Sequence, residues 1–305
     1  MTEADWVNAL EVFRASLPRR GARGRDDRLF LEALHYFSVH NITWRALPER
    51  FGRWNSVWKR FDRLSKAGVF ETFFDHLASL SSSAHLVQMF DSTVVRAHVS
   101  AAGRKRGQDG QALGRSRGGF STKIHLKTDF DGHPIAFDLT GGEKGDAPHF
   151  PVLLGLGPDV DPRAAIGDKG YASKANRRAA RERGIVPVIP HKANEKDKPA
   201  FFARTLYKGR ARIEQAAGKL KRFKRVALRC EKTKRNFASF VALTAGFILL
   251  KSVHTAQQAK PVRANGRRQP VDLLHRIGSA SATRSVVGEE FIAVVLDGGG
   301  SHGRP

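Results

Sequence analysis

Cysteine is almost absent from this 305-residue chain, in which Cys230 is the only one. A single cysteine excludes an intramolecular disulfide and any metal site built from several thiolates. The first 17 residues lack an apolar core behind a basic start, so we expect no secretory signal and a reducing, cytoplasmic location. The longest apolar run, residues 237–250, contains Ser239 and Thr244 and is too short to span a bilayer. We expect it to form a buried helix.

Acidic residues are also scarce: 29 Asp and Glu face 53 Lys and Arg, which gives a formal net charge of +24. Half of this excess lies in residues 201–255, which hold 14 basic and two acidic residues. A concentrated basic block favours binding to a nucleic-acid backbone, because neutralised phosphates release their counterions. The alternatives are an anionic membrane surface or a solvated face. No helix here sets a clean basic face against a bulky apolar face, so membrane binding is the weaker interpretation.

Residues 1–82 have the pattern of short helices. Apolar residues recur at helical intervals in RLFLEALHYF, and NSVWKRFDRLSKAG predicts a further helix that Asn55 or Ser56 caps and that ends at Gly68. Basic residues of this helix, Lys59, Arg60 and Arg63, lie away from its apolar stripe. The pattern fits a helix-turn-helix arrangement, and it fits equally a small bundle whose basic residues only increase solubility.

The periodicity changes to that of strands from residue 86 onward. LVQMFDSTVVRAHVS predicts one strand, and STKIHLKTDFDGHPIAFDLT predicts a hairpin with Asp131-Gly132 at its turn. AAIG predicts a buried strand that Asp168 closes, followed by a helix, and IVPVIP predicts another strand. Strands followed by alternating strands and helices predict a mixed α/β fold in which helices cover the sheet.

A glycine-rich basic segment, residues 101–120, lies between the first two predicted strands. It holds six glycines and five basic residues, which predict a flexible loop and not a core element. The loop either contacts phosphates or is simply disordered. Its basic residues are Arg104, Lys105, Arg106, Arg115 and Arg117.

Glu214 is the single acid in YKGRARIEQAAGKLKRFKR, residues 207–225. In a helix of ~100° per residue, Tyr207, Arg210, Glu214 and Lys221 project within about 60° of one another. A neighbouring cation favours the ionised carboxylate, which suits a metal ligand. The simpler interpretation is an intrahelical pair with Arg210, which contributes ~0.3–0.5 kcal/mol.

Two further acids stand at strand ends, Asp91 after LVQMF and Asp168 after AAIG. Carboxylates at strand ends point into the crevice where such sheets bind ligands. Each has a simpler interpretation, because Asp91 could be a cap and Asp168 a turn former. Together with Glu214, however, they can form an all-oxygen site for Mg²⁺ or Mn²⁺.

These spaced motifs resemble those of the DDE transposases of bacterial insertion sequences, in the group named after insertion sequence five. The family's Tyr-x2-Arg-x3-Glu-x6-Lys signature is filled without a gap by Tyr207, Arg210, Glu214 and Lys221. DSTVVRAH and GDKGY resemble the segments that carry the two catalytic aspartates, and WRALPERFGRWNSVWKRFDRLSKAGVF resembles the N-terminal DNA-binding region. The resemblance covers roughly residues 10–255. Ala172 departs from it, since the family often has an acid there.

The resemblance implies an α/β ribonuclease H-like catalytic core with a mixed sheet, residues 83–255, preceded by a small all-helical, helix-turn-helix-like DNA-binding domain, residues 1–82. It implies that Asp91, Asp168 and Glu214 are the catalytic residues and bind two Mg²⁺ or Mn²⁺ ions. Water would first release a 3′-hydroxyl at the element's end, and that hydroxyl would then attack target DNA.

The implied partners are double-stranded DNA, as terminal inverted repeats and as target, and a second copy of the chain in a synaptic homodimer. No membrane or small-molecule substrate is implied, and the location would be the bacterial nucleoid. The expected DNA-binding residues are Tyr207, Arg210, Arg212, Lys221, Arg104, Lys105, Arg106, Arg115, Arg117, Lys59, Arg60 and Arg63.

Other functions remain open at this point. One is a decayed or domesticated transposase that only binds DNA, and another is a ribonuclease H-like nuclease without strand transfer. A ribosome- or RNA-binding structural module would account for the charge but not for the three acids. The resemblance stops near residue 255, and residues 256–305 are expected to be a disordered extension.

Overall fold

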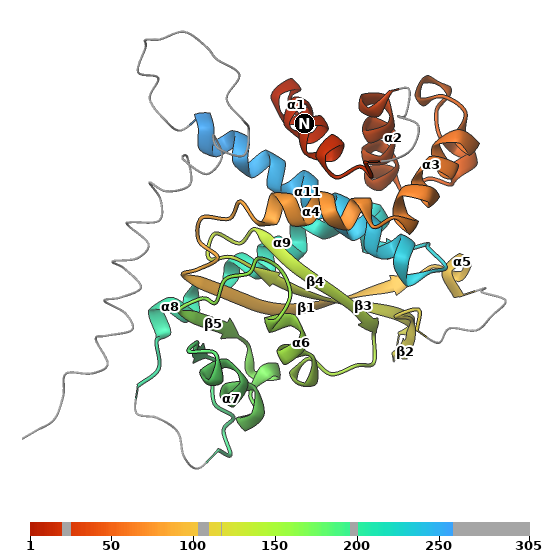
Figure 1. The fold of residues 1–305 in the computed structure, drawn as a ribbon. Helices are drawn as coiled ribbons and strands as arrows, with labels where there is room; N and C mark the ends of the chain where they lie inside the picture. The colour runs from red at the N-terminus through yellow and green to blue at the C-terminus, as the bar shows by residue number, and fades with distance from the viewer. Residues whose placement is uncertain (20–25, 103–109, 117, 196–200, 259–305) are drawn as a thin grey trace, which may run out of the picture.

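The computed structural model describes residues 1–19, 26–102, 110–116, 118–195 and 201–258, which form a central sheet with helices on both of its faces (Figure 1). In chain order the elements are α1 (Glu3–Ala15), α2 (Asp27–His40), η1 (Trp44–Ala46), η2 (Glu49–Phe51), α3 (Trp54–Lys66), α4 (Val69–Ala78), β1 (Val87–Ala97), α5 (Val99–Ala102), β2 (Gly114–Ser116), β3 (Gly119–Thr128), β4 (Pro134–Gly141), η3 (Ala147–His149), α6 (Phe150–Leu154), β5 (Ala164–Gly167), η4 (Lys169–Tyr171), α7 (Lys174–Glu182), β6 (Val186–Val188), α8 (Arg204–Lys208), α9 (Ala211–Arg222), α10 (Lys224–Ala227), β7 (Leu228–Arg229) and α11 (Lys234–Gln258).

The sheet is mixed, and β1 lies at its centre. Its order is β4-β3-β1-β5-β6, with β3 antiparallel to both β1 and β4, and with β5 parallel to both β1 and β6. The short strand β2 extends β3 as a second partner, and β7 pairs with the end of β1. The predicted mixed α/β fold is therefore confirmed, as are the Asp131-Gly132 turn, where Gly132 has a φ of 80°, and the buried strand before Asp168.

The two faces of the sheet are covered differently, because side chains along a strand alternate between faces. Met89 points into the larger hydrophobic cluster, to which α4, α9 and α11 contribute. Phe90, the next residue, packs against Phe150 and Tyr171 in a smaller cluster on the α6 and α7 side. Along β1, every second residue counted from Met89 therefore faces the larger cluster, and every second residue counted from Phe90 faces the smaller cluster.

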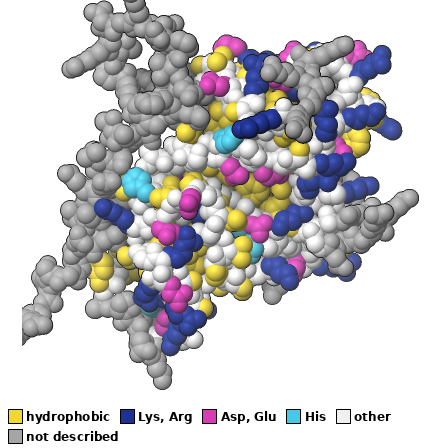
Figure 2. Space-filling view, in the orientation of Figure 1, with side chains coloured by type: hydrophobic (Ala, Val, Ile, Leu, Met, Phe, Trp, Pro, Cys, Tyr) yellow, Lys and Arg dark blue, Asp and Glu magenta, His cyan; other side chains and the backbone are white. Residues whose placement is uncertain are grey.

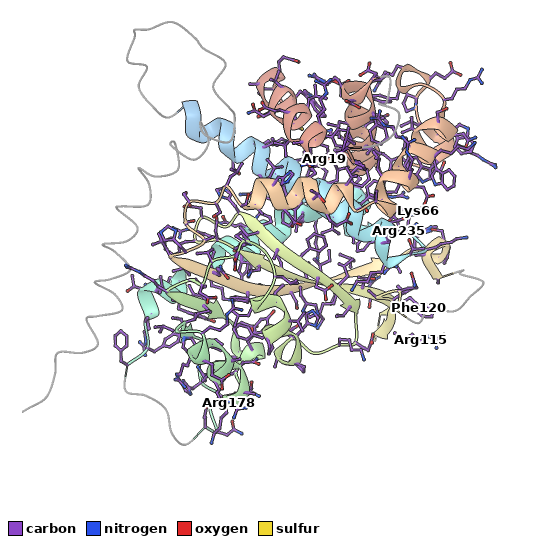
Figure 3. All side chains as sticks on the ribbon, viewed as in Figure 1. Arg19, Lys66, Arg115, Phe120, Arg178 and Arg235 are labelled. Atoms are coloured by element: carbon purple, nitrogen blue, oxygen red, sulfur yellow. The ribbon has the colours of Figure 1, made fainter. Side chains whose placement is uncertain are left out.

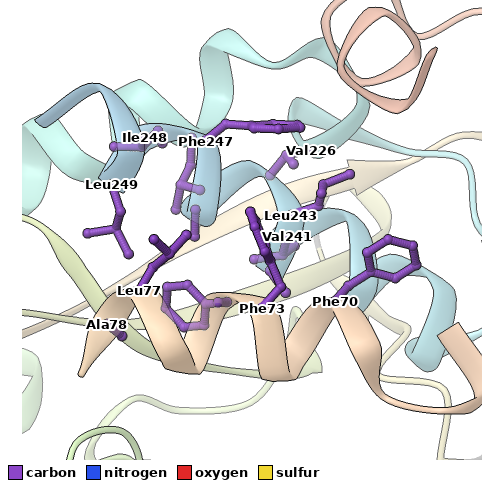
Figure 4. Close-up of a cluster of buried hydrophobic side chains, with 14 of the residues drawn as sticks. Phe70, Phe73, Leu77, Ala78, Val226, Val241, Leu243, Phe247, Ile248 and Leu249 are labelled. Atoms are coloured by element: carbon purple, nitrogen blue, oxygen red, sulfur yellow. The ribbon is translucent and has the colours of Figure 1, made fainter. Parts of the chain in front are cut away.

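Helix α11 is the apolar helix that the sequence predicts. Its buried side chains pack against α4, and Figure 4 shows Phe73 and Leu77 of α4 facing Val241 and Phe247. A Cβ at Gly246 would lie 2.5 Å from Cε1 of Phe73, so only glycine allows this close approach. Among the described residues, no helix has the length and apolarity needed to cross a membrane.

Helices α1 to α4 confirm the helical character predicted for residues 1–82, and they share the larger hydrophobic cluster with α11 and the sheet. Arg225 contributes a polar link between the two parts. Its guanidinium lies 4.4 Å from the ring centroid of Phe37, donates to Oδ1 of Asn41 at 2.8 Å, and donates to Oε1 of Glu231 at 2.5 Å. The N-terminal helices are therefore packed closely onto the rest of the described chain.

The expected cap of α3 is wrong. The helix begins at Trp54 after Arg53, which makes no side-chain capping bond, so Asn55 and Ser56 lie inside its first turn. The cause is the turn before it: Gly52, at a φ of 86°, redirects the chain out of η2 and brings it into the helix earlier than the polar pattern indicates.

The segment expected as a flexible loop, residues 101–120, contains regular structure in its described part. β2 and the start of β3 form a hairpin there, with the guanidinium of Arg115 5.0 Å from the ring centroid of Phe120 (Figure 3). Residues 103–109 and 117 lie outside the described part.

Candidate active site

Asp91 and Asp168 are neighbours because of the register of two parallel strands. Phe90 of β1 pairs with Gly167 of β5, so Asp91 and Asp168 are the next residues along two adjacent strands. Residues paired in this way project from the same face, and strands in a sheet lie about 4.8 Å apart. Asp91 is two residues after Met89 and therefore lies on the same face of the sheet. Both carboxylates are thus on the side that α9 covers.

Asp91 is held by two hydrogen bonds and is 18% exposed. The amide of Ser92 donates to its Oδ1 at 2.8 Å, and Nη2 of Arg210 donates to its Oδ2 at 2.9 Å. Burial raises the pKa of Asp91 above its ordinary value, the Ser92 amide and Arg210 oppose this, and the negative charges of Asp168 and Glu214 raise it further. Three acids thus converge, with one guanidinium among them.

Asp168 leaves β5 with an extended backbone and caps the short helix η4. Its Oδ1 accepts a hydrogen bond from the amide of Gly170 at 2.8 Å. A Cβ at Gly170 would lie 2.9 Å from that oxygen, so a larger residue would displace the carboxylate. The sequence Asp-Lys-Gly therefore fixes one rotamer of Asp168.

Glu214 lies in the first turn of α9, where the helix dipole favours a negative charge. The expected continuous helix is interrupted: Tyr207 belongs to α8, and Gly209 and Arg210 separate it from α9. From its position before α9, Arg210 donates to Glu214 through Nη1 and to Asp91 through Nη2. The intrahelical pair considered as the simpler interpretation exists, but the same guanidinium also joins the helix to the sheet.

Oxygen donors of this kind suit a hard divalent cation. Burial is the main cause of the raised pKa of Asp91, and repulsion by Asp168 and Glu214 adds to it; Arg210 opposes both effects, and a bound cation would do the same. The residues present therefore fit Mg²⁺ or Mn²⁺.

A different group has its ligand atoms closer together. Among the described residues, Asp129, Asp131 and His133 place their ligand atoms within 4.8 Å of one another, which Asp91, Asp168 and Glu214 do not. Its acids already have partners, since Ser81 donates to Asp129 at 2.6 Å and Ser83 donates to Asp131 at 3.0 Å. This group lies at the β3–β4 turn and stabilises it.

Tyr207, Lys221 and Arg212 have different surroundings. Burial raises the pKa of the Tyr207 phenol. Arg210 opposes this effect, and the negative charges of Asp168, Glu214 and Asp91 add to it, which places the ring near the acids. Nζ of Lys221 donates to the carbonyl of Val94 at 3.1 Å. Arg212 lies on another side of α9 and donates to the carbonyl of Phe130 at 2.9 Å.

The N-terminal candidates differ in their surroundings. Lys59 and Arg63 are exposed, and in the described part of the chain they form no ion pair. Arg60 is 14% exposed, pairs with Asp27, and lies 4.1 Å from the ring centroid of Phe30. Figure 2 shows Lys and Arg side chains gathered over the α2 and α3 end of this face.

Several predicted residues lie outside the described residues. They are Arg104, Lys105, Arg106, Arg117 and residues 259–305 of the extension, whose first three residues belong to α11. Arg115 is described and exposed, on the β2–β3 hairpin.

Sequence reasoning missed Asp146 and Tyr171. The pKa of Tyr171 is raised by burial and further by Asp146, Asp91 and Asp168, and its buried hydroxyl has no hydrogen-bond partner among the described residues. Asp146 accepts a hydrogen bond from Oγ of Ser92 at 2.7 Å. Tyr171 stands in the GDKGY motif, but no periodic signal indicates Asp146.

A mixed α/β fold with converging carboxylates beside a basic helix is typical of enzymes that act on phosphate esters. The family described as "Transposase DDE domain" matches residues 82–249, and the family described as "Putative transposase of IS4/5 family" matches residues 1–74. This chain belongs to the family of DDE transposases of insertion sequences. Membership implies an enzyme that cleaves nucleic acid and uses divalent metal ions.

Three curated relatives match parts of the chain. An uncharacterized protein of Sinorhizobium fredii, y4sN, is 42% identical over 94 residues, or 30% of this chain and 72% of that protein. The putative transposase for insertion sequence element IS402 of Burkholderia cepacia is 30% identical over 147 residues, 45% of this chain and 67% of that protein. The putative transposase for insertion sequence element IS6501 of Brucella ovis is 33% identical over 142 residues, 43% of this chain and 99% of that protein.

One solved structure, titled "Crystal structure of a pre-cleavage Mos1 transpososome", is similar over 80% of this chain and 83% of that chain. Its sequence identity is 13% and its TM-score is 0.24. A score this low carries no argument about this chain.

Proposed function

We propose that this transposase binds the terminal inverted repeats of an insertion sequence, cleaves DNA at the element's ends and joins the freed 3′-hydroxyl to target DNA. One observation carries the proposal. Asp91 and Asp168 occupy neighbouring positions on two parallel strands, and Arg210 joins Asp91 to Glu214. A protein that only binds DNA gains nothing from holding three carboxylates together beside a basic helix, because they repel the phosphates.

The catalytic residues in this proposal are Asp91, Asp168 and Glu214, in a ribonuclease H-like core. The mixed sheet, with β3 and β4 antiparallel on one side of β1 and β5 and β6 parallel on the other, supports this assignment. The three acids would hold two Mg²⁺ or Mn²⁺ ions. When bound, such ions activate the attacking oxygen and stabilise the leaving oxygen in an in-line displacement at phosphorus.

The chain's own residues have separate roles in the reaction. Asp91 is rigid, because its two oxygens are each held by a hydrogen bond, and Asp168 is fixed by the Gly170 amide. Glu214 is 56% exposed and stands where DNA would approach. Arg210 neutralises part of the negative charge of the site, because its two terminal nitrogens donate to Glu214 and Asp91.

DNA contacts in this proposal come from two regions. Tyr207 lies near the acids, Arg212 and Lys221 belong to the same helix as Glu214, and the exposed Lys59 and Arg63 lie on α3 of the N-terminal helices. We assign residues 1–82 to end recognition and residues 83–255 to catalysis. Joining two DNA ends to one target requires two active sites, so a homodimer is the expected assembly.

The test is a cleavage and strand-transfer assay on duplex DNA copied from the sequence that flanks the reading frame, in Mg²⁺ or Mn²⁺. Glu214→Gln should abolish cleavage and leave DNA binding within about twofold. Glu182→Gln is the matched control, because Glu182 is an exposed helical acid of α7 that pairs with Arg178. Binding without cleavage in the unaltered protein would favour a DNA binder that has lost its activity. Cleavage without joined products would favour a nuclease.

A further inference from the structure

The segment between β4 and α6 lies against the face of the sheet opposite the three acids. Asp146 is its anchor: Oδ1 accepts from Oγ of Ser92 at 2.7 Å and from Nζ of Lys123 at 3.0 Å. Lys123 also donates to the carbonyl of Lys144 at 2.6 Å, which fixes the backbone of the segment. Lys123 is 11% exposed, and its bond to Asp146 is partly buried.

Ser92 connects this anchor to the active site. It follows Asp91 on β1 and therefore points to the opposite face, where its hydroxyl reaches Asp146. Its amide points toward the acids and donates to Oδ1 of Asp91 at 2.8 Å. Ser92 thus binds Asp91 through its backbone amide and Asp146, on the opposite face of the sheet, through its hydroxyl.

The same segment is tied to the region of Asp168. Asn176 is 3% exposed, and its Nδ2 donates to the carbonyl of Ala147, beside Asp146, and to the carbonyl of Tyr171, each at 2.9 Å. Tyr171 ends the short helix that Asp168 caps. The dipeptide Asp146-Ala147 is therefore linked to the residue that follows Asp91, through Ser92, and to the short helix that Asp168 caps, through Asn176.

We propose that Asp146 is a positioning residue for the metal-binding carboxylate of Asp91 and acts through Ser92. It does not touch the reacting atoms, since it lies on the other face of the sheet. Its hydrogen bond with Ser92 fixes the β1 backbone at Ser92, and with it the amide that selects one rotamer of Asp91. Outer partners of this kind orient metal ligands, and their removal typically weakens metal binding 10- to 100-fold. The inference rests on the proposed function.

If Asp146 only stabilised the segment, removing any other anchor of the segment would have the same effect as removing Asp146. Asp138 provides such a comparison. Asp138 is another anchor of the same segment, because Nε2 of His149 lies 2.9 Å from its Oδ2 and Lys234 donates to its Oδ1 at 3.0 Å. Neither of these bonds involves Ser92. Asp138→Ala therefore loosens the segment as Asp146→Ala does, but leaves the Ser92 contact in place.

The experiment measures Mn²⁺ binding to the full chain by electron paramagnetic resonance, together with kcat and KM for cleavage of the flanking duplex. Asp146→Ala should weaken Mn²⁺ binding about 10-fold and lower kcat, with KM for DNA within twofold of the unaltered protein. Ser92→Ala should do the same, Ser92→Thr should restore binding, and the double variant should be no weaker than either single variant. Asp138→Ala should bind Mn²⁺ within twofold of the unaltered protein.

Equal losses in Asp138→Ala and Asp146→Ala would overturn the proposal, as would additive losses in the double variant. Ser92→Ala covers the case in which Asp146→Ala fails to fold. Asp91→Asn tests the proposed function separately. Normal Mn²⁺ binding in that variant would show that Asp91 is not a metal ligand and would contradict the proposed active site. If Asp91→Asn loses binding while Asp146→Ala and Ser92→Ala keep it, only the positioning role is lost.

Discussion

The guanidinium of Arg210 donates to Oδ2 of Asp91 at 2.9 Å from a position just before α9, and its other terminal nitrogen reaches Glu214. Burial would lower the pKa of Arg210, but Asp91 and Glu214 raise it above its ordinary value. One cation thus joins the strand acid to the helix acid, across two segments that are more than 100 residues apart in the sequence.

Arg210→Gln should therefore lower the Tm of the metal-free protein. Asp91 and Arg210 are each 18% exposed, and loss of one partner from a largely buried ion pair costs up to about 3–5 kcal/mol. Partial exposure reduces this value, so we expect a fall in Tm of roughly 2–6 °C. Added Mn²⁺ should stabilise the variant more than the unaltered protein, because a cation replaces the lost charge.

Differential scanning fluorimetry with and without Mn²⁺ measures this effect. Arg222→Gln is the control, since Arg222 is an exposed residue of the same helix with no ion pair among the described residues. The same Tm fall in both variants, without a difference in the response to Mn²⁺, would contradict the role of Arg210.

Gly170→Ala should damage the site without damaging the fold. The added Cβ would lie 2.9 Å from Oδ1 of Asp168, and that side chain can rotate away. Cleavage should fall at least about 10-fold, since misplaced catalytic groups cost this much or more, while Tm should change little. Gly218→Ala is the matched control, because nothing lies within 4 Å of its added Cβ in α9. Unchanged cleavage in Gly170→Ala would show that the rotamer of Asp168 is unimportant.

Local patterns predicted the two strands beside the acids, because each holds a short apolar run next to an aspartate. Asp168 follows β5 as expected, but the expectation that Asp91 ends its strand is wrong: β1 runs from Val87 to Ala97 and Asp91 lies inside it, because the pairing of β1 with β3 continues past Asp91. Local patterns also predicted the β3–β4 turn and the apolar helix α11. The turn at Gly209 and Arg210 that separates α8 from α9 was not predicted, because both residues keep helical backbone angles and the side-chain pattern continues across it. The cap of α3 failed for a different reason, since the turn at Gly52 decides where that helix begins.

Asp146 illustrates the limit of sequence reasoning at the candidate site. It lies 54 residues from Ser92 in the sequence, in a segment of glycines and turns, and the hydrogen bond between them exists only once β1, β3 and the segment have packed. Residue spacing identifies groups that share a helix face or a strand end. It does not identify a side chain that reaches the same strand from the opposite face of the sheet.

The pair formed by His133 and Asp129 should make stability depend on pH. Burial would lower the pKa of His133, but the hydrogen bond and charge of Asp129 raise it, and the pKa of Asp129 is lowered by His133 and Ser81 in spite of burial. The His133 contribution is complete below its unfolded pKa of about 6.5 and is lost as pH rises through the higher folded value. That of Asp129 is complete above about pH 4 and is lost as pH falls further.

Tm measured from pH 5 to 9 should therefore fall more steeply above pH 6.5 in the unaltered protein than in His133→Asn. The two proteins should differ most near pH 5.5, and each kcal/mol of difference corresponds to roughly 2–4 °C. Parallel curves for the two proteins would show that the pair does not contribute.

The N-terminal helices offer the clearest separation of DNA binding from folding. Lys59 and Arg63 are exposed on α3, whereas Arg60 pairs with Asp27 and packs over Phe30. Lys59→Gln and Arg63→Gln should each weaken binding to the flanking duplex and reduce the slope of log K against log salt by about 1, because each phosphate contact releases about one counterion. Arg60→Gln should instead lower Tm and leave the salt slope unchanged. Fluorescence anisotropy at several salt concentrations measures the slopes, and a slope unaffected by both Lys59→Gln and Arg63→Gln would exclude α3 from the DNA interface.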